Sequence, residues 1–411
     1  MVHELTPSAA ANGSVPNWVF LDGTPLLNGP PTSEFKADNL RPEVEYITTW
    51  PSSGLNNQVI EFMNLIYLAL ITERVPIISD FTPLHVGHNA PVISFGEVFD
   101  VPRLQKELGP IFEWRQVKDP QSDSVDNLGC WNVRKAVQTK DKALPPPRHL
   151  KLDVSYTMPP SWIKLFPDKG DYHASFWSLA SLSFPDTLAS VPKTPSISPI
   201  HKLSLPPDEH LLCYDNLYFV SVHYAFELEH DVSPAWRFVG RHMHWAPKVQ
   251  EVADSYIRQA FGIDSTESIP PYIAIHVRHG DFSSQCKDVT LEDCYAPLSV
   301  ISRRVEEVKE EIWSSKGITI DHVIMTSDEK NTTWWEAVHE VGWASPDHSR
   351  TVELYGEWYP VLIDAAIQSA GLGFIGTLRS TVSLTAQLRV STWQGGVVRT
   401  VRWGWPGADD H

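Results

Sequence analysis

The sequence predicts an α/β protein built from two doubly wound domains with parallel sheets. A strand–turn–helix–strand order occurs near residue 50, and short apolar runs alternate with helical patterns in the C-terminal half of the 411 residues. Polar side chains stand directly after several of the predicted strands. Alternating strands and helices are typical of a parallel sheet that is covered by helices on both faces.

In the N-terminal half, residues 44–50 predict a strand, residues 59–71 a mostly buried helix, and residues 75–78 a second strand. The turn between the first strand and the helix reads SSGLNNQ over residues 52–58. A glycine-bearing turn that enters a helix presents free backbone N–H groups to a phosphate. The turn is equally explained if its glycine only allows the bend and its asparagines only cap the helix.

The C-terminal half has the alternation that a doubly wound sheet requires. Helices are predicted at 247–261, 291–314, 332–341 and 359–370, and strands at 272–277, 322–327, 373–376 and 397–402. The charged stretch within the second of these helices predicts a solvated face with i,i+4 ion pairs, not a binding surface.

The segment PYIAIHVRHGDF, residues 271–282, is the most informative part of the chain. Its apolar start predicts a buried strand, and four polar residues stand at or just beyond the carboxyl end of that strand: His276, Arg278, His279 and Asp281. Ligands of open α/β sheets bind beyond the carboxyl ends of the strands. Because a guanidinium is a planar donor that stays charged, Arg278 suits an anionic ligand such as a diphosphate. A surface ion pair at the strand end is the alternative explanation.

Near the C-terminus, a glycine-punctuated strand at 371–377 is followed by LRSTVS and by a helical pattern at 384–392. Ser380 and Thr381 therefore lie at another strand-to-helix junction, where hydroxyl groups and backbone amides can hold an anion. N-capping of the helix is the alternative role for these two residues.

These segments resemble the GDP-fucose-dependent O-fucosyltransferase superfamily, which includes protein O-fucosyltransferases and, more distantly, α1,6-fucosyltransferases. The family's Gly-Asn-Gln loop is matched by residues 54–58, its His-x-Arg-x-Gly-Asp strand end by residues 276–281, and its Gly-Thr and Ser-Thr pairs by residues 376–381. Residues 322–329 resemble a family strand that ends in an acidic residue near the nucleotide. The four motifs stand in the family's order, and the resemblance extends from about residue 44 to residue 403.

The resemblance implies a GT-B-like fold, in which two Rossmann-like domains face each other across a cleft and the C-terminal domain holds the donor. It implies an inverting transfer of fucose from GDP-fucose to a hydroxyl acceptor on a glycan or on a protein Ser or Thr. As catalytic residues, Arg278 would bind the β-phosphate and stabilise the leaving GDP, and Asn57 would lie beside the sugar. The other donor-binding residues would be Gly54, Leu55, Asn56, His276, Asp281, Asp328, Ser380 and Thr381. Among these, the Ser-Thr pair would bind the diphosphate and Asp328 the guanosine portion, while Asp281 would orient Arg278 or contact the ligand.

Some positions depart from the family pattern. Val59 stands where many relatives carry Arg, and Val382 where protein O-fucosyltransferases often carry Phe. The glutamate that some relatives use as a general base in the glycine-bearing turn is absent. Since transfer to a hydroxyl normally needs a group that takes the proton, this role is left open between Asn57 with a water, Asp80 and Glu61.

Two other functions are compatible with these motifs. The same fold could use another nucleotide-deoxysugar, such as a rhamnosyl donor, because plant relatives of this motif set include such enzymes. Alternatively, the missing glutamate and the two valines would suit a catalytically silent nucleotide-sugar-binding protein.

Composition limits the expected partners. The formal net charge of −17 argues against non-specific binding of nucleic acid. The four cysteines lack zinc-site spacing, so we expect no metal and no cofactor beyond GDP-fucose as donor substrate. Whether Cys286 pairs with Cys294, and Cys130 with Cys213, is left open. We expect a monomer.

The sequence predicts three segments. Residues 1–43 predict an irregular lead-in, residues 44–235 an N-terminal, acceptor-side Rossmann-like domain, and residues 236–411 a C-terminal donor domain. A Pro-rich insertion at 144–207 predicts either an acceptor-binding surface or a loop-rich cover. The family resemblance implies the ER or Golgi lumen, yet the first residues lack a signal-peptide pattern and no stretch is apolar enough to span a bilayer, so the compartment is left open.

Overall fold

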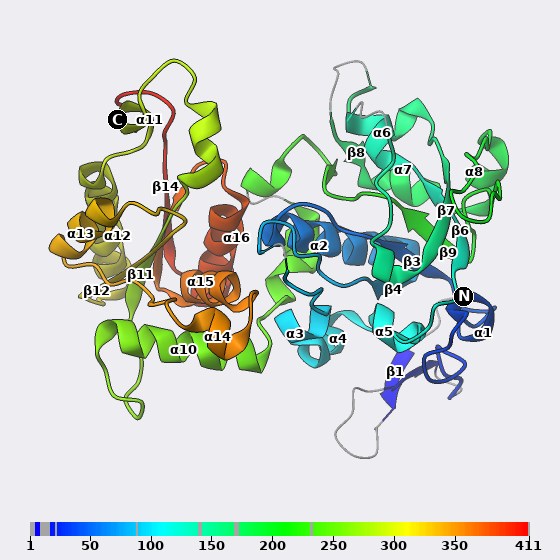
Figure 1. Ribbon diagram of the computed structural model, residues 1–411, viewed down its shortest axis with the longest axis horizontal. Coiled ribbons are helices and arrows are strands. Elements are labelled where there is room, and N and C mark those ends of the chain that lie inside the picture. The colour runs from blue at the N-terminus through cyan, green and yellow to red at the C-terminus, as the bar shows by residue number, and fades with distance from the viewer. Residues whose placement is uncertain are drawn as a thin grey trace. The chain divides into compact units, whose positions relative to one another are not determined.

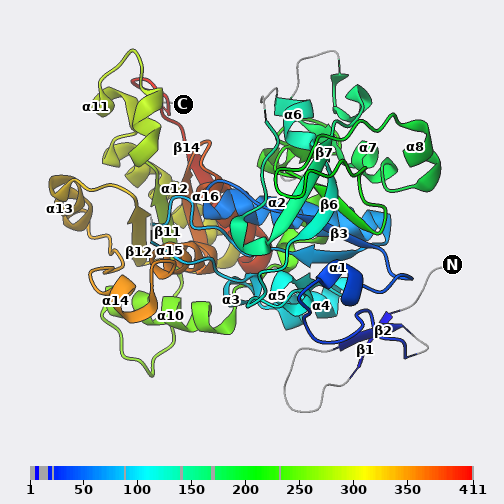
Figure 2. The same ribbon diagram turned by 45° about the vertical axis from the view of Figure 1, so that its right-hand side comes forward.

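The protein is described by a computed structural model that covers residues 5–8, 17–20, 23–87, 89–138, 142–167, 172–230 and 233–409. The chain divides into two compact units, Met1–His244 and Trp245–His411, which we call the first and the second unit. Figures 1 and 2 label the elements of both units. Each unit has its own parallel sheet with helices packed against it.

The first unit begins with short elements where an irregular segment was expected. β1 (Leu5–Ser8) and β2 (Asn17–Phe20) form an antiparallel pair, and α1 (Phe35–Asp38) is a single helical turn.

The main sheet of the first unit has six parallel strands in the order β5-β4-β3-β9-β6-β7. These strands are β3 (Tyr46–Thr49), β4 (Val75–Ile78), β5 (Phe112–Glu113), β6 (Asp126–Trp131), β7 (Leu152–Thr157) and β9 (Leu211–Tyr214). A small parallel pair is made by β8 (Ala174–Ser175) and β10 (Val220–Ser221). The helices are α2 (Leu55–Thr72), α3 (Phe95–Val98), α4 (Val101–Leu108), α5 (Trp114–Val117), α6 (Val133–Gln138), α7 (Phe176–Ser181), α8 (Pro185–Ser190) and α9 (Pro234–Phe238).

α2 is the central helix of the first unit. Gly54 precedes it in an extended conformation, and Glu73 ends it in the left-handed conformation. Most of its residues are buried because it packs on β3 and β4 and against α7 and α9. α9 packs against α2 and belongs to the first unit, which extends to His244.

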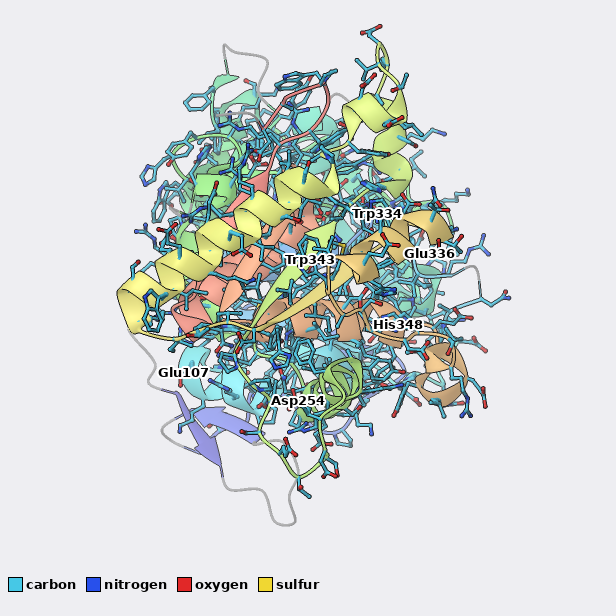
Figure 3. All side chains as sticks on the ribbon, turned by 90° about the vertical axis from the view of Figure 1, so that its left-hand side faces the viewer. Glu107, Asp254, Trp334, Glu336, Trp343 and His348 are labelled. Carbon is cyan, nitrogen blue, oxygen red and sulfur yellow. A yellow bond between two sulfur atoms is a disulfide. The ribbon has the colours of Figure 1, made fainter. Side chains whose placement is uncertain are left out.

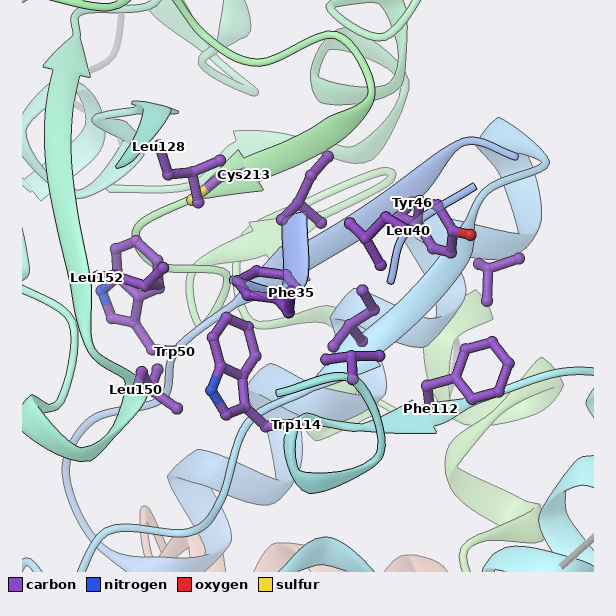
Figure 4. Close-up of a cluster of buried hydrophobic side chains, with 14 of the residues drawn as sticks. Phe35, Leu40, Tyr46, Trp50, Phe112, Trp114, Leu128, Leu150, Leu152 and Cys213 are labelled. Carbon is purple, nitrogen blue, oxygen red and sulfur yellow. The ribbon is translucent and has the colours of Figure 1, made fainter. Parts of the chain in front are cut away.

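The first unit contains a cluster of buried apolar side chains (Figure 4). No residue of α2 belongs to this cluster. Phe35 of α1 packs edge-on against Trp114, with ring centroids 4.8 Å apart. Cys130 of β6 and Cys213 of β9 lie in this cluster and form a disulfide between neighbouring strands.

The second unit has four parallel strands in the order β12-β11-β13-β14. The strands are β11 (Tyr272–Val277), β12 (His322–Ser327), β13 (Gly373–Thr377) and β14 (Val397–Val401). The helices are α10 (Pro247–Phe261), α11 (Leu291–Cys294), α12 (Leu298–Lys316), α13 (Thr332–Glu340), α14 (Thr351–Tyr355), α15 (Tyr359–Ala370) and α16 (Thr381–Arg389).

Alternate residues of β11 face opposite sides of this sheet, as the pleat of a strand requires. Ile273 and Ile275 join the core beneath α12, whereas the hydroxyl of Tyr272 donates to the carbonyl of Ile367 in α15 at 2.7 Å. Figure 3 views the α12 side, where Trp334 of α13 is labelled. The strand therefore sends its even-numbered side chains toward α15 and α16.

Three predicted helices differ in detail from the observed ones. The helix expected at 59–71 begins earlier, at Leu55. The helix expected at 291–314 is broken into α11 and α12, because Pro297 lacks the N–H that a continuous helix would need. The helix expected at 384–392 begins earlier, at Thr381, and its end is a π-turn at Val390–Gln394. In the described ranges, no helix combines the length and apolarity needed to cross a bilayer.

Candidate functional site

The carboxyl ends of β11, β12 and β13 meet at one edge of the second unit's sheet, because the three strands are parallel and β11 lies between the other two. Hydrogen bonds tie the ends of β11 and β13 together. The backbone N–H of Arg278 donates to the Thr377 hydroxyl at 3.0 Å, and this hydroxyl donates to the carbonyl of His276 at 3.0 Å. Side chains that are about a hundred positions apart in the sequence therefore share one edge.

Arg278 is held at this edge by two carboxylates. Its Nη1 lies 2.8 Å from Asp328 Oδ2, and its Nη2 lies 2.8 Å from Asp281 Oδ1. The Arg278 side chain is still 28% exposed. The ion pair that the sequence left as an alternative is thus present, and it fixes the direction of a guanidinium that keeps further N–H groups for a ligand.

Gly280 allows Asp328 to approach the β11 end closely. A Cβ atom at position 280 would lie 2.1 Å from Asp328 Oδ2, so no other residue fits here without moving the carboxylate. The second oxygen, Oδ1, accepts the backbone N–H of His279 at 2.8 Å. Asp328 therefore bonds both to the backbone after β11 and to the guanidinium.

The His279 ring, which the sequence placed at the strand end without a specific role, forms part of the wall of this site. Its Nδ1 lies 2.7 Å from Glu329 Oε2, and its ring stacks on Tyr295 with centroids 4.0 Å apart. The Tyr295 hydroxyl in turn donates to the His279 carbonyl at 2.8 Å. The acidic pair at 328–329, directly after a predicted strand, was a signal that both carboxylates could serve the same edge.

The N-terminus of α16 lies beside the same strand ends. Ser380 is its N-cap, and the Ser380 hydroxyl accepts the backbone N–H of Ser383 at 3.4 Å. A Cβ atom at Gly376 would lie 2.7 Å from the Ser383 side chain, so this glycine lets the helix start approach β13. Thr381 is half-buried at the first helical position. The N-capping role of Ser380 and the position of the α16 start beside the strand ends thus occur together.

His276 is neutral in this environment. Burial lowers its pKa to about 3, and the nearby charge of Arg278 adds to the effect. Its Nδ1 lies 2.7 Å from the Ser383 hydroxyl, which also accepts the backbone N–H of Thr377 at 2.9 Å. When the hydroxyl donates to Nδ1, the ring proton lies on Nε2, where it can serve as a donor; the other tautomer places the proton on Nδ1. Ser383 was not predicted as a site residue, although its i+3 spacing from the cap was visible.

The remaining predicted residues, Gly54 to Asn57, lie together in the first unit. They form the start of α2, at the carboxyl end of β3. Leu55 and Asn56 are buried, and Asn57 is half-buried. They are thus at the corresponding edge of their own sheet.

The two carboxylates that the sequence left open as proton acceptors differ in access. Glu61 is fully buried, and its oxygens accept the backbone N–H groups of Ser52 at 2.8 Å and Leu217 at 3.3 Å. Asp80 is partly exposed and lies 3.2 Å from the Nε2 atom of His149. Of the two carboxylates, only that of Asp80 is partly exposed to solvent.

Within the described ranges of the chain, no group of three or more His, Cys, Asp or Glu side chains is placed to hold a metal ion. Cys286 and Cys294 form a disulfide that closes the loop after the Arg278 strand end.

The sequence matches the family described as GDP-fucose protein O-fucosyltransferase over residues 46–311, which is well over half of the chain. Among solved structures, POFUT1 in complex with GDP-fucose has a TM-score of 0.54 at 14% identity, over 89% of this chain and 99% of that one. POFUT1 in complex with GDP has a TM-score of 0.53 at 13% identity, over 89% and 99% of the two chains. Its apo-form has a TM-score of 0.52 at 15% identity, over 88% and 98%. No curated protein matches the sequence.

By its fold, the chain is a mixed α/β protein with parallel sheets, of the GT-B-like kind that the sequence predicted. It belongs to the GDP-fucose protein O-fucosyltransferase family. The resemblance drawn from the motifs is therefore confirmed, and with it the class of glycosyltransferase.

Proposed function

We propose that the chain transfers fucose from GDP-fucose to a hydroxyl group of a glycan or protein acceptor, with inversion at the anomeric carbon. The main support is the position of Arg278, which is held at three converging strand ends beside the N-terminus of α16. A fixed guanidinium and a helix N-terminus both favour the negative charge of a diphosphate. The similarity of fold to POFUT1 in complex with GDP-fucose adds to this support.

In this proposal, Arg278 stabilises the β-phosphate as the bond between the anomeric carbon and the phosphate oxygen breaks. Neutral His276 donates a hydrogen bond to the same nucleotide. Ser380 and Thr381 bind the diphosphate together with backbone N–H groups of α16. Asp328 serves the guanosine portion, and its bonds to the β11 end give it an orienting role as well.

Asn57, at the start of α2, contacts the sugar and the attacking hydroxyl, together with Gly54, Leu55 and Asn56. The acceptor oxygen forms the new bond as GDP leaves, and its proton passes to water held by Asn57 or to a carboxylate. Exposure favours Asp80 over Glu61 for the second route. Asp281 is proposed to orient Arg278 through its ion pair.

The nucleotide can be tested by thermal unfolding in the presence of GDP, UDP or GMP. A ligand that binds only the native state raises the apparent stability by mass action. We expect stabilisation by GDP, less by GMP, which lacks the β-phosphate, and none by UDP. Stabilisation by UDP instead would favour a rhamnosyl donor, and a folded protein that responds to none of the three would contradict the proposal.

Release of GDP from GDP-fucose then separates an enzyme from a silent nucleotide-sugar-binding protein. Incubation with GDP-fucose and candidate acceptors should yield GDP and a fucosylated product. Binding of GDP-fucose without turnover against any acceptor or water would favour the silent binder.

A further inference from the structure

The turn before α2 is conformationally strained. Ser53 has a φ of 72°, in the left-handed region that side-chain-bearing residues rarely adopt. A strained backbone of this kind persists only where surrounding contacts hold it. We call residues 51–54 the pre-helix turn, because they connect β3 to the helix start that carries Asn57.

Two side chains of α2 reach back and hold this turn. The amide of Gln58 donates to the carbonyl of Ser53 at 2.8 Å and to the carbonyl of Thr82 at 2.8 Å. One turn further along the helix, Glu61 accepts the backbone N–H of Ser52 at 2.8 Å. Hydrogen bonds from α2 side chains therefore hold the turn at the backbone N–H of Ser52, before the strained residue, and at the carbonyl of Ser53.

Glu61 also connects the turn to the end of β9. Its Oε1 atom accepts the side-chain amide of Asn216 and the backbone N–H of Leu217, the latter at 3.3 Å. All three partners of the carboxylate are donors, so an ionised carboxylate satisfies each of them. One fully buried group thus joins two loops that leave neighbouring strands at the same sheet edge.

We propose that Glu61 is a positioning residue, whose carboxylate couples the end of β9 to the pre-helix turn and thereby fixes Asn57 for contact with the sugar. The inference rests on the proposed function for its consequence in catalysis. Its structural part, the order of the pre-helix turn, stands independently of that function.

The charges around Glu61 make this coupling depend on pH. Burial raises the pKa of Glu61 to about 8, and the negative charge of Asp215 adds to the effect, while Ser52, Leu217 and Arg134 oppose it. Tyr218 is the other titratable group in electrostatic contact with Glu61. Because a protonated carboxyl presents an O–H to partners that are themselves donors, one of the three bonds weakens below this pH.

Glu61→Gln separates the chemistry of the group from its volume. The glutamine has one acceptor oxygen and one NH2 group, so a single oxygen cannot serve Ser52 on one side and Asn216 on the other. In the double variant Glu61→Gln/Asn216→Asp, the glutamine amide can donate to the new carboxylate while its oxygen accepts from Ser52. The double variant should therefore restore the hydrogen bond that holds Ser52 in the pre-helix turn. The longer bond from Leu217, at 3.3 Å, is lost in both variants.

The matched control is Glu113→Gln. Glu113 is also a buried carboxyl of the first unit whose pKa burial raises, and it accepts a backbone N–H, that of Gly96, at 3.2 Å. It lies at the end of β5, which is separated from β3 by β4 in the sheet. Its replacement should leave residues 52–57 unchanged.

The first measurement is amide hydrogen exchange at residues 52–57, corrected for intrinsic rates, at pH values below and above 8. Above pH 8, where the wild-type carboxylate is ionised, we expect exchange in Glu61→Gln to exceed that of the wild type on the order of tenfold or more. The rise should be reversed in the double variant and absent in Glu113→Gln. The wild-type protection should increase as pH passes 8, and Glu61→Gln should lack this increase. Unchanged exchange in a folded Glu61→Gln, or equal exchange in the single and double variants, would overturn the positioning role.

The second measurement compares GDP affinity with turnover of GDP-fucose. At a pH above 8, Glu61→Gln should bind GDP within about twofold of the wild type and turn over GDP-fucose on the order of tenfold or more slowly, because a misplaced group costs rate without costing nucleotide affinity. A loosened turn with unchanged turnover would overturn the catalytic consequence alone. If the wild-type protein itself does not bind GDP, the proposed function is overturned instead.

Discussion

Arg278 combines the two roles that a strand-end arginine can have. It forms ion pairs with Asp281 and Asp328, and it does so at an edge where backbone N–H groups and a helix start also gather. Both carboxylates hold the guanidinium in one orientation before any ligand arrives. Orientation of this kind lowers the cost of binding an anion, because the side chain need not be ordered at that moment.

Arg278→Lys tests this residue directly. The lysine keeps the charge but loses the planar fork of donors. Turnover of GDP-fucose should fall on the order of 100-fold or more, as it does when an electrostatic stabiliser of the transition state is lost. Arg350→Lys is the control, because Arg350 is an exposed residue paired only with the neighbouring Glu353 among the described ion pairs. Near-normal turnover in Arg278→Lys would remove Arg278 from the catalytic assignment.

Asn57→Ala should separate the sugar from the nucleotide. If Asn57 contacts the fucose, the variant should keep its GDP affinity within a few-fold and lose most of its transfer activity, because only transition-state contacts are removed. Calorimetry with GDP and turnover of GDP-fucose measure the two effects. Asn28→Ala, at an exposed position, is the control. A folded Asn57→Ala protein that fails to bind GDP would show that the α2 start serves the phosphates instead.

At the scale of elements, the ends of β11 and β12 are joined through Gly280 and Asp328. Gly280→Ala would place a Cβ atom 2.1 Å from Asp328 Oδ2, so the carboxylate must move and its bonds to Arg278 and His279 must weaken. We expect GDP affinity to fall by about tenfold or more, since one lost charge-assisted bond is worth roughly 1.5–3 kcal/mol. The midpoint of thermal unfolding with and without GDP provides the measurement.

Gly29→Ala is the matched control for this substitution. A Cβ atom at Gly29 meets nothing within 4 Å, so the added methyl group should change neither stability nor GDP affinity. If Gly280→Ala also binds GDP like the wild type, Asp328 does not orient the nucleotide-binding arginine.

Helix boundaries were predicted well where a proline marks the start of the helix. α10 and α15 run over the predicted residues; α10 begins at Pro247, and Pro360 is the second residue of α15. The predicted helix at 291–314 was wrong because its apolar spacing continues across Pro297, and spacing alone does not register the missing N–H. Local chemistry thus outweighs periodicity at such a point.

The partners of the site residues could not be predicted in the same way. That β11 lies between β12 and β13 follows from pairing across 50 to 100 positions, which no local pattern encodes. The sequence therefore did not predict the contact between Ser383 and His276, because this contact requires α16 to pack beside the end of β11. The residue types at the strand ends were readable, but their mutual contacts were not.

At the scale of the whole molecule, the two units carry buried groups whose protonation affects stability in opposite directions. In the first unit, burial raises the pKa of Glu61 to about 8 and that of Asp215 to about 6. In the second unit, burial lowers the pKa of His276 to about 3. The sign of each effect follows from which state binds more protons.

Between pH 4.5 and 8 the folded first unit holds a proton on Glu61 that the unfolded chain has lost, so its free energy of unfolding falls as pH rises. Asp215 acts in the same direction between about 4 and 6. The slope is up to about 1.4 kcal/mol per pH unit for each group. Between pH 3 and 6.5 the unfolded chain protonates His276 while the folded second unit does not, so the free energy of unfolding of that unit rises with pH. From pH 4.5 to pH 5.5, calorimetric unfolding should therefore show a component that moves to lower temperature and one that moves to higher temperature. GDP should shift the second, and Glu61→Gln should reduce the shift of the first to the part that Asp215 contributes. Both components moving together in the wild type would contradict the opposed titration of the two units.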